Sequence, residues 1–416
     1  MRILFFGLNF EPEPIGIGPY STGLCRGLEE RGHSVTAITG KPYYPNWRKP
    51  EGTSAGWTRD TIAEINIIRC PLYVPENPSG KSRLLHHASF AISASAPMVA
   101  MARRFQPDLV FSVAPSLASA PVGRLAAKIA GAMSWLHVQD FEVEAAFKTG
   151  LLDPTSGVGG AVRKVERRLL DGFDVYSSIS REMCDRLAQS GVAPDRIVEF
   201  RNWANVLPTV SNNTLRNAWN VTTPHVALYS GNIANKQGVE IIVEAAKRLR
   251  ERRDLTFIVC GNGPYRANLI ALAEGLPNIQ FHDLQPTERL HELLALATVH
   301  LLPQKAEAVG LVLPSKLTNM LASGRPVVVT APQDSSLAHE VEGCGIATPP
   351  GDGASFATAI STIIDDHQMC KDMGARAIKR VRERWHRETI LDRVEHEMEV
   401  RLEARRASRI ECLLEP

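Results

Sequence analysis

The chain has 416 residues, of which 44% are hydrophobic and 22% charged, and its formal net charge is only +2. This length exceeds what one compact core usually holds, so two domains are expected. The small net charge argues against a protein built to bind nucleic acid. The seven cysteines form no C-x-x-C pair, which favours a reduced, cytoplasmic chain without structural disulfides or a zinc site.

A first buried strand is expected over residues 2–7, RILFFG. Glu11 and Glu13 follow it at once, so the N-terminus lacks the apolar length and cleavage site of a signal peptide. The longest uncharged stretch, 84–102, contains two histidines, several serines and a proline, and it is too polar for a membrane span.

A buried, kinked helix is the favoured interpretation of the stretch 84–102. A helix on a membrane surface is the alternative, because basic residues flank the stretch on both sides. These residues are Lys81, Arg83, Arg103 and Arg104.

A strand–loop–helix–strand unit occurs twice, about two hundred residues apart. The first copy is RILFFG, a glycine-containing loop, a helical stretch over 20–31, then HSVTAIT; the second is HVALYSG, a loop over 232–237, a helical stretch over 238–252, then LTFIVCG. Further strands are expected over 108–114, 134–140, 174–180 and 196–202, and at NIQFHDL, VHLLPQ and RPVVVTA. Short apolar strands alternating with helices predict parallel sheets covered on both faces. The chain is therefore expected to be an α/β protein with two doubly wound domains.

The polar segment over 203–225 has little periodicity and two prolines, which is typical of a connection between domains. We expect a first domain over 1–205 and a second over 206–385. The charged tail predicts a helix over about 386–410, and packing of this helix back on the first domain stays open. Its last basic cluster is expected to be solvated.

Two loops of the first half follow predicted strands at the edge where open α/β sheets bind ligands. Gly16 and Gly18 precede a helix, where glycines let the backbone approach a ligand and helix-start N–H groups favour an anion. An ordinary tight turn is the alternative. His137 and Asp140 could orient a sugar hydroxyl or transfer a proton. Taken alone, a core histidine and a helix-capping aspartate are the favoured interpretation of this pair.

The second half has a similar loop, Gly231-Asn232, with Lys236 at the entrance of the next helix. Lys236 could neutralise phosphate charge there, and a solvated lysine is the alternative. Gly261 also follows a strand. Neither its loop nor the loop over 16–21 completes a dinucleotide fingerprint, so an NAD-dependent dehydrogenase is a poor second choice.

The fourth loop lies in EAVGLVLPSKLTNMLASGRPVVVTA, residues 307–331. Ser315 is a good N-cap for a helix over 316–322, and Gly324 suits its C-cap. A phosphate or ribose oxygen at this helix start would receive backbone N–H groups, with Lys316 beside it. Taken alone, Glu307 is a surface acid.

These motifs resemble the retaining glycosyltransferases of family 4. The resemblance is carried in the family's order by PEPIGIGPYSTGLCRGLEERGHSVTAITG, SISREMCDRLAQSGVAPDRIVEFRNWAN, YSGNIANKQGVEIIVEAAKRL, CGNGPYR and EAVGLVLPSKLTNMLASGRPVVVTA. It implies the GT-B fold, in which two Rossmann-like doubly wound domains face each other across an interdomain cleft. GIGPY, HVQD, GNIANKQG and LPSK are most similar to bacterial members of exopolysaccharide gene clusters, of the colanic-acid type.

The resemblance implies a role for each motif. Gly16 and Gly18 match the loop between the donor phosphate and the acceptor. His137 and Asp140 fall where the family places a histidine that contacts the acceptor or the sugar, and the choice between them stays open. Gly231 and Gly261 belong to the donor-binding loops.

In the second half the chain departs from the family's pattern. Asn232 replaces an arginine that would lie on the diphosphate, and Lys236 stands one residue early. Glu307 matches the acid facing the donor sugar. Ser315 replaces the glutamate that usually holds the ribose, and Lys316 could restore part of the positive charge.

The resemblance implies transfer of a hexosyl or deoxyhexosyl group from a UDP- or GDP-linked sugar to a saccharide acceptor, with retention and without a metal or cofactor. A lipid-linked acceptor and contact with an anionic membrane, on the inner face of the cytoplasmic membrane, are further expectations. The basic run over 163–168 would then lie near lipid, or it is a solvated helix face. A sugar-nucleotide epimerase and a non-catalytic nucleotide-sugar-binding subunit are the alternatives.

Overall fold

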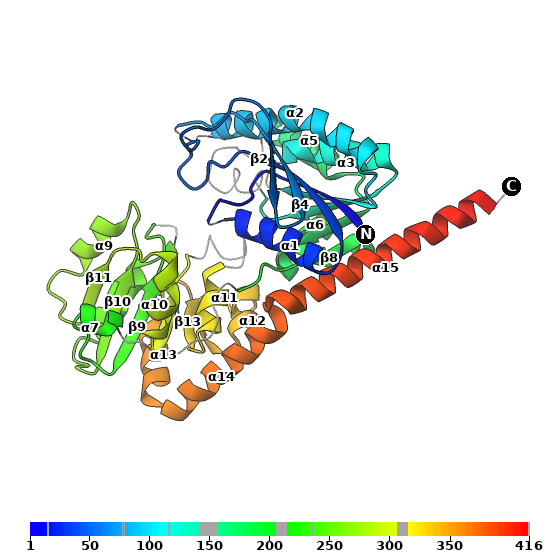
Figure 1. Cartoon of the computed structure of the whole chain (residues 1–416). Helices are drawn as coiled ribbons and strands as arrows, with labels where there is room; N and C mark the ends of the chain where they lie inside the picture. The colour runs from blue at the N-terminus through cyan, green and yellow to red at the C-terminus, as the bar shows by residue number, and fades with distance from the viewer. Residues whose placement is uncertain are drawn as a thin grey trace. The chain divides into compact units, whose positions relative to one another are not determined.

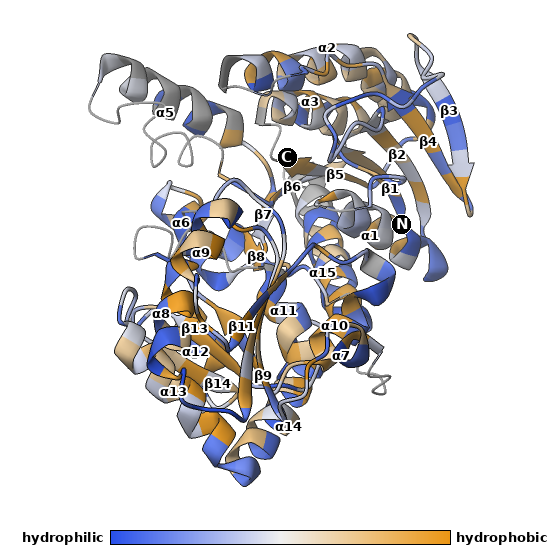
Figure 2. Cartoon of the chain, turned by 90° about the vertical axis from the view of Figure 1, so that its left-hand side faces the viewer, coloured by the Kyte–Doolittle hydropathy of each residue, from blue (hydrophilic) through white to orange (hydrophobic). Residues whose placement is uncertain are grey.

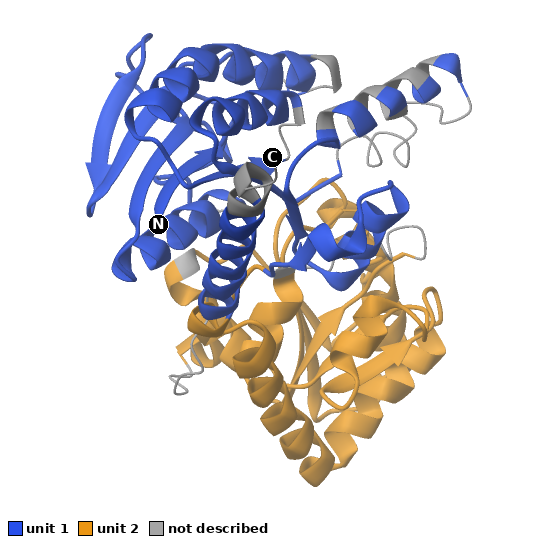
Figure 3. Ribbon diagram, turned by 90° about the vertical axis from the view of Figure 1, so that its right-hand side faces the viewer, with its two compact units in different colours: residues 1–201, 390–416 blue, residues 202–389 orange. Residues whose placement is uncertain are grey.

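The chain forms two compact units in a computed structural model. One unit consists of residues 1–201 with 390–416, and the other of residues 202–389 (Figure 3). The structure describes residues 1–14, 16–76, 78, 80–114, 117–141, 156–204, 214–234, 237–305 and 315–414.

The first unit is a sheet covered by helices (Figure 1). Its strands are β1 (Arg2–Gly7), β2 (Ser34–Gly40), β3 (Thr58–Ile62), β4 (Ile65–Cys70), β5 (Leu109–Ala114), β6 (Met133–Val138), β7 (Val175–Ser178) and β8 (Ile197–Glu199). Its helices are α1 (Gly18–Glu30), α2 (Gly80–Arg104), α3 (Ala120–Ala130), α5 (Gly157–Leu170), α6 (Arg181–Gln189) and most of α15 (Arg387–Leu414).

The strand order of this sheet is β3-β4-β2-β1-β5-β6-β7-β8. All neighbours pair in parallel except β3 and β4, which form an antiparallel edge pair. Central strands such as β5, LVFSVA, are buried along their whole length, whereas β3, TRDTI, is polar and exposed (Figure 2). Polar residues suit an edge strand because they discourage pairing with another chain. The order reverses between β1 and β5, which places a ligand-binding edge at their carboxyl ends.

Helix α2 is only half buried. Its inner side places Phe90, Ala94 and Met98 in the core, at a spacing of four residues. Its outer side leaves Leu84 and Ile92 exposed by 69% and 76%. The expectation of a buried helix is therefore wrong for the outer face. None of the described helices is long and apolar enough to cross a membrane.

The C-terminal helix α15 packs against the first unit through one apolar stripe. The buried residues of this stripe are Leu391, Val394, Met398 and Leu402. The basic cluster near its end is not simply solvated, so that expectation is wrong. The Arg405 guanidinium donates to Asp174 at 2.7 Å, and the Arg406 guanidinium donates to Asp108 at 3.2 Å. The helix carries these arginines to acids just before β7 and β5.

The second unit is a six-stranded parallel sheet with helices on both faces. Its strands are β9 (His225–Ser230), β10 (Leu255–Cys260), β11 (Ile279–His282), β12 (Val299–Leu302), β13 (Val327–Thr330) and β14 (Gly345–Thr348). Its helices are α7 (Thr214–Ala218), α8 (Glu240–Arg248), α9 (Arg266–Leu272), α10 (Leu290–Ala295), α11 (Ser315–Ala322), α12 (Ser336–Val341), α13 (Gly353–Asp365) and α14 (His367–Arg384).

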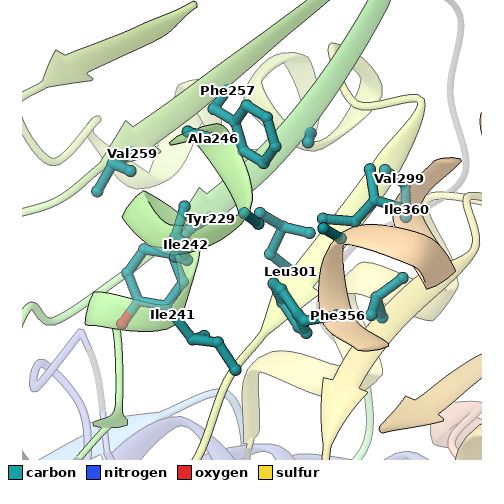
Figure 4. Close-up of a cluster of buried hydrophobic side chains, with 14 of the residues drawn as sticks. Tyr229, Ile241, Ile242, Ala246, Phe257, Val259, Val299, Leu301, Phe356 and Ile360 are labelled. Carbon is teal, nitrogen blue, oxygen red and sulfur yellow. The ribbon is translucent and has the colours of Figure 1, made fainter. Parts of the chain in front are cut away.

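The core of this unit lies where α8 and α13 pack on the sheet. Ile242 of α8 and Phe356 and Ile360 of α13 meet Phe257 and Leu301 of the strands (Figure 4). All five are essentially inaccessible to solvent. The strand order β11-β10-β9-β12-β13-β14 reverses between β9 and β12, so this sheet also has a ligand-binding edge at the carboxyl end of β9.

The expectation of an α/β protein with two Rossmann-like sheets is confirmed. The sequence analysis did not anticipate three strands: β3, β4 and β14. β3 is mostly exposed and polar, and β14 is a short strand, GIAT, that begins with glycine. Such strands carry little of the apolar signal by which buried strands are recognised.

Candidate functional site

The loop after β1 is held in place by a buried glutamate, Glu13, which is only 5% exposed. Its carboxylate accepts the side-chain amide of Asn9 at 2.8 Å and the backbone N–H groups of Tyr43 and Tyr44 at 3.0 and 3.1 Å. Burial raises the pKa of the Glu13 carboxyl, against the lowering effect of these hydrogen bonds. Glu13 therefore ties the loop after β1 to the segment after β2.

This role of Glu13 was not predicted from the sequence. Its only signal was an acid between two prolines in EPEPIGIG, directly before the glycine loop.

Gly16 and Gly18 lie in the same loop and at the start of α1. Gly16 has a φ of +77°, and a Cβ there would lie 3.0 Å from the Tyr44 ring. A Cβ on Gly18 would lie 3.1 Å from the Glu13 Cβ and backbone oxygen. Both glycines therefore allow the loop to fold tightly against Glu13 and Tyr44, at the carboxyl edge of β1.

His137 lies inside the first unit and is 2% exposed. Its Nδ1 is 2.9 Å from the Ser177 hydroxyl, and its Nε2 is 3.0 Å from the Gln139 side-chain amide. Burial lowers the pKa of His137 to about 3, so the imidazole is neutral at physiological pH. With both ring nitrogens engaged, His137 positions Gln139 at the end of β6. The neighbouring Asp140 is exposed at the same edge.

In the second unit, glycines let two neighbouring loops meet backbone to backbone. Gly231 follows β9, and Gly261 and Gly263 follow β10. A Cβ on Gly261 would collide with the Gly231 carbonyl oxygen, and a Cβ on Gly263 would collide with the Ile233 carbonyl oxygen. Hydrogen bonds join the loops, from Gly231 N to Cys260 O at 2.9 Å and from Ile233 N to Asn262 O at 2.9 Å. The result is a surface of side-chain-free backbone at the carboxyl edge.

Lys316 lies directly against this backbone surface. A Cβ on Gly231 would collide with the end of the Lys316 side chain. The Lys316 ammonium donates to the Tyr229 hydroxyl at 3.2 Å and lies 4.8 Å from the centre of the Tyr229 ring. The same hydroxyl donates to the Asn232 carbonyl at 2.6 Å. Tyr229 thus fixes both the lysine and the loop after β9.

The charge of Lys316 is not compensated by the described part of the chain. Burial lowers the pKa of Lys316 to about 8, and no carboxylate of the described residues pairs with it. A partly buried cation without a counter-ion is costly, and an anionic ligand would relieve that cost. Lys316 is therefore the strongest anion-binding feature described at this edge.

The structure brings together Gly231, Asn232, Gly261 and Lys316, which the sequence analysis named for the donor. Helix α11 begins at Ser315, one residue before the expected helix, and Gly324 has the left-handed φ of +71° expected of a C-cap. Lys236 and Glu307 lie outside the described residues.

Two Rossmann-like sheets, one of them with glycine-lined loops and Lys316 at its carboxyl edge, match the GT-B fold of solved glycosyltransferase structures. The model of the glycosyl transferase 4-like domain matches residues 16–203, and the model of the glycosyl transferases group 1 matches residues 211–380. The chain belongs to this family of glycosyltransferases, and it is an enzyme of that type.

A curated relative supports this assignment over most of the chain. It is named as a colanic acid biosynthesis glycosyl transferase, WcaI, of Escherichia coli (strain K12). The two sequences are 41% identical over 343 residues, which cover 80% of this chain and 83% of the relative.

Solved structures with low sequence identity share the fold. A sucrose-phosphate synthase from Thermosynechococcus elongatus matches with a TM-score of 0.72 and 17% identity, over 97% of this chain and 100% of that one. HepE of Anabaena, solved in complex with UDP and glucose, matches with a TM-score of 0.67 and 15% identity, over 96% of this chain and 100% of that one.

Proposed function

We propose that this glycosyltransferase moves a hexosyl or deoxyhexosyl group from a UDP- or GDP-linked sugar to a saccharide acceptor, with retention at the anomeric carbon. The observation that carries the proposal is Lys316, whose ammonium lies on the backbone surface of Gly231 without a counter-ion among the described residues. A diphosphate placed there would supply the missing negative charge. The bound UDP in the Anabaena neighbour supports a nucleotide donor.

The proposed mechanism rests on stabilising charge that develops on the leaving diphosphate. A fixed, poorly solvated cation is effective at this task because it needs no reorganisation when the bond breaks. The family has an arginine at position 232, where this chain has Asn232. In this chain, Lys316 supplies the positive charge near the diphosphate instead. Lys236 would add to it, and Glu307 would face the donor sugar, as the resemblance to the family implies.

No strong protein base is needed if the departing phosphate oxygen accepts the proton of the acceptor hydroxyl. The state of His137 agrees with this route, because an enclosed imidazole with a pKa of about 3 is a poor general base at neutral pH. We assign His137 the positioning of Gln139, and Gln139 or Asp140 the contact with acceptor or sugar. The loop of Gly16 and Gly18 would contribute backbone next to the donor phosphate.

We further propose a lipid-linked saccharide acceptor in exopolysaccharide synthesis, on the cytoplasmic face of a membrane. The name of the Escherichia coli relative supports the pathway class. The exposed Leu84, Leu85 and Ile92 of α2 support contact with a lipid surface.

Proton NMR of the product, compared with the donor, tests the reaction. We expect the anomeric configuration of the donor to be kept, and an inverted linkage would overturn the retaining assignment. Incubation without acceptor is the control, because conversion of the donor to an epimer under these conditions would point to an epimerase. A thermal-shift comparison of UDP- and GDP-sugars identifies the base.

Substitution tests the role of Lys316. Lys316→Ala should lower kcat/KM by roughly ten- to a thousand-fold, the range found when a single charge-stabilising group is removed. Lys247→Ala is the matched control, because Lys247 is an exposed lysine of α8 in the same unit. If the two variants had equal kcat/KM, Lys316 would not be part of the donor site.

A further inference from the structure

An arginine-lined cavity lies at the opposite edge of the first unit's sheet, where the strands begin. A cavity of about 520 Å³ is lined there by Arg2 at the start of β1, by Arg103 at the end of α2 and by Arg405 and Arg406 of α15. The loop of Gly16 and Gly18 follows the carboxyl end of β1, so this arginine cavity is separate from the proposed transfer site.

Positive charge dominates the arginine cavity. Its one acidic residue, Asp108, already accepts the backbone N–H of Arg2 at 2.7 Å and the Arg406 guanidinium at 3.2 Å. The guanidinium groups of Arg2 and Arg103 have no hydrogen bond or ion pair within the described part of the chain. This surplus of positive charge favours an anion as the occupant.

Arg405 lies in the cavity wall and is already bonded to the protein there. Its terminal nitrogens donate to Asp174 and to the Ala132 carbonyl, at 2.7 and 3.2 Å. Its Nε is enclosed and has no hydrogen-bond partner in the described structure. Guanidinium groups present several N–H donors in a planar fork that matches the oxygens of a phosphate. The guanidinium groups of Arg2 and Arg103, which have no partner in the described structure, therefore suit the several oxygens of a phosphate group better than a single chloride ion.

Apolar side chains lead along the protein surface to the arginine cavity. Leu85, Ile92 and Arg103 are spaced by seven and eleven residues on α2, so they share one face of the helix. Leu85 and Ile92 are exposed by 56% and 76%, and Ile129 of α3, which lines the cavity, is exposed by 36%. The face therefore carries two exposed apolar side chains and ends in a cation.

An exposed tryptophan lies beside the same helix. The Trp57 indole N–H donates to the Ser93 carbonyl of α2 at 2.9 Å, yet the residue stays 56% exposed. Tryptophan is favoured where an apolar body meets a polar boundary, as at a membrane interface. An apolar helix face with an interfacial tryptophan and a cationic end is typical of a surface that lies on anionic lipid.

We propose that the arginine cavity binds the phosphate of an anionic phospholipid headgroup while the outer face of α2 lies in the membrane surface. The cavity then fixes the orientation of the first unit on the lipid, beyond what diffuse attraction would give. This inference extends the proposed membrane contact and does not depend on which sugar is transferred.

Vesicle binding by matched charge variants tests the proposal. The double variant Arg2→Gln/Arg103→Gln removes two cations that line the cavity. The control, Arg104→Gln/Lys128→Gln, removes two exposed cations, of α2 and α3, that do not line the cavity. We expect the cavity variant to bind phosphatidylglycerol-containing vesicles at least roughly tenfold more weakly than the native chain at about 0.1 M salt, from two lost charges near the lipid surface.

The control variant should lose clearly less affinity for these vesicles. Equal losses in the two variants would show diffuse attraction and overturn the cavity as a site, as would failure of the native chain to bind the vesicles. Unfolding temperatures measured alongside check that both variants stay folded. Donor binding, measured by thermal shift with UDP- and GDP-sugars, should be unchanged in both, so a failure of this inference is distinguishable from a failure of the proposed transfer reaction.

Glycerol 3-phosphate and inorganic phosphate separate the lipid from a soluble source of the same group. We expect weak binding of both by calorimetry, lost in Arg2→Gln/Arg103→Gln. Leu85→Ser/Ile92→Ser should lower vesicle binding and leave glycerol 3-phosphate binding unchanged. If this apolar variant binds vesicles as the native chain does, the lipid assignment is overturned in favour of a soluble phosphate ligand.

Discussion

Lys316 is the residue whose surroundings say most about what the second unit binds. A lysine is expensive to bury, and here its ammonium has only the hydroxyl and ring face of Tyr229 as described partners. An unpaired, partly buried lysine is therefore a candidate for binding an anionic ligand. A bound diphosphate would offset the cost of burying the ammonium group of Lys316, and it would hold the donor at the same time.

The pH dependence of donor binding is the first prediction. With a pKa of about 8 in the free protein, Lys316 is charged at pH 6.5 and largely neutral at pH 8.5. Because the diphosphate prefers the charged form, we expect affinity to fall about fourfold over this range. Lys316→Arg should remove the effect, since a guanidinium stays charged. Calorimetry with an intact nucleotide sugar measures it, and an unchanged slope in Lys316→Arg would contradict the assignment.

Glu13 supports the second prediction, which concerns stability. Glu13→Ala leaves the backbone N–H groups of Tyr43 and Tyr44 without their acceptor inside the fold, and leaves the Asn9 amide only its longer bond to the Tyr43 hydroxyl, at 3.4 Å. We expect a loss of about 2–4 kcal/mol in the free energy of unfolding. Urea unfolding measures this loss.

Glu11→Ala is the matched control for Glu13→Ala. Glu11 pairs with Arg26 at 2.7 Å, with both side chains about two-fifths exposed (40% and 41%). Such an exposed pair contributes about 0–1 kcal/mol. Similar losses in the two variants would mean that Glu13 does not organise the loop.

At the scale of elements, the loops after β9 and β10 act as one surface because glycines remove the side chains between them. Gly261→Ala would place a methyl group on the Gly231 carbonyl oxygen. We expect the loops to separate, with a loss of about 1–3 kcal/mol from overpacking and clearly weaker donor binding. Gly56→Ala, where no atom lies near the added methyl, should change neither thermal stability nor donor affinity. Normal donor binding in Gly261→Ala would disprove the joint surface.

Helix α15 is held to the first unit by charged pairs as well as by its apolar stripe. Glu395 pairs with Arg31 at 3.1 Å and with His33 at 2.7 Å, and its side chain is 20% exposed. We expect Glu395→Ala to cost about 1–3 kcal/mol because it strands partly buried donors. Glu403→Ala, an exposed position on the same helix, should stay within about 0.5 kcal/mol. Thermal unfolding of both variants decides whether the helix contributes through this cluster.

Most elements with strong apolar periodicity were predictable, although the apolar strand β4, INIIRC, was missed. β1, β5, β9 and β10 are buried, apolar-rich strands of six residues, and each was expected within a residue or two of its observed bounds. β3 and α15 show two different reasons why features were not predicted from the sequence. The edge strand β3 is too polar to be recognised, and the arginines of α15 looked solvated because their acid partners lie two to three hundred positions away.

At the scale of the whole molecule, the two units are expected to respond to different ligands. A nucleotide sugar should slow amide hydrogen exchange in the loops over 231–234 and 261–263 and at the start of α11. The loop over 9–18 should gain further protection when an acceptor is added, because that loop belongs to the first unit. Hydrogen exchange followed by mass spectrometry measures both steps. If the nucleotide sugar slowed exchange only in the first unit, the assignment of donor binding to the second unit would be wrong.

The fold class and the positions of the candidate site loops could be predicted from local sequence signals. Apolar periodicity and glycine placement are local signals, so runs such as LVFSVA and loops such as Gly231-Asn232 are visible along the chain. The burial and the bonding partners of the residues in those loops, by contrast, depend on tertiary contacts. His137 is buried, and the Glu13 carboxylate holds the glycine loop through hydrogen bonds. The Lys316 side chain lies against Gly231, and four arginines line one cavity. Burial and the pairing of charges arise from segments far apart in sequence, and for that reason no local pattern contains them.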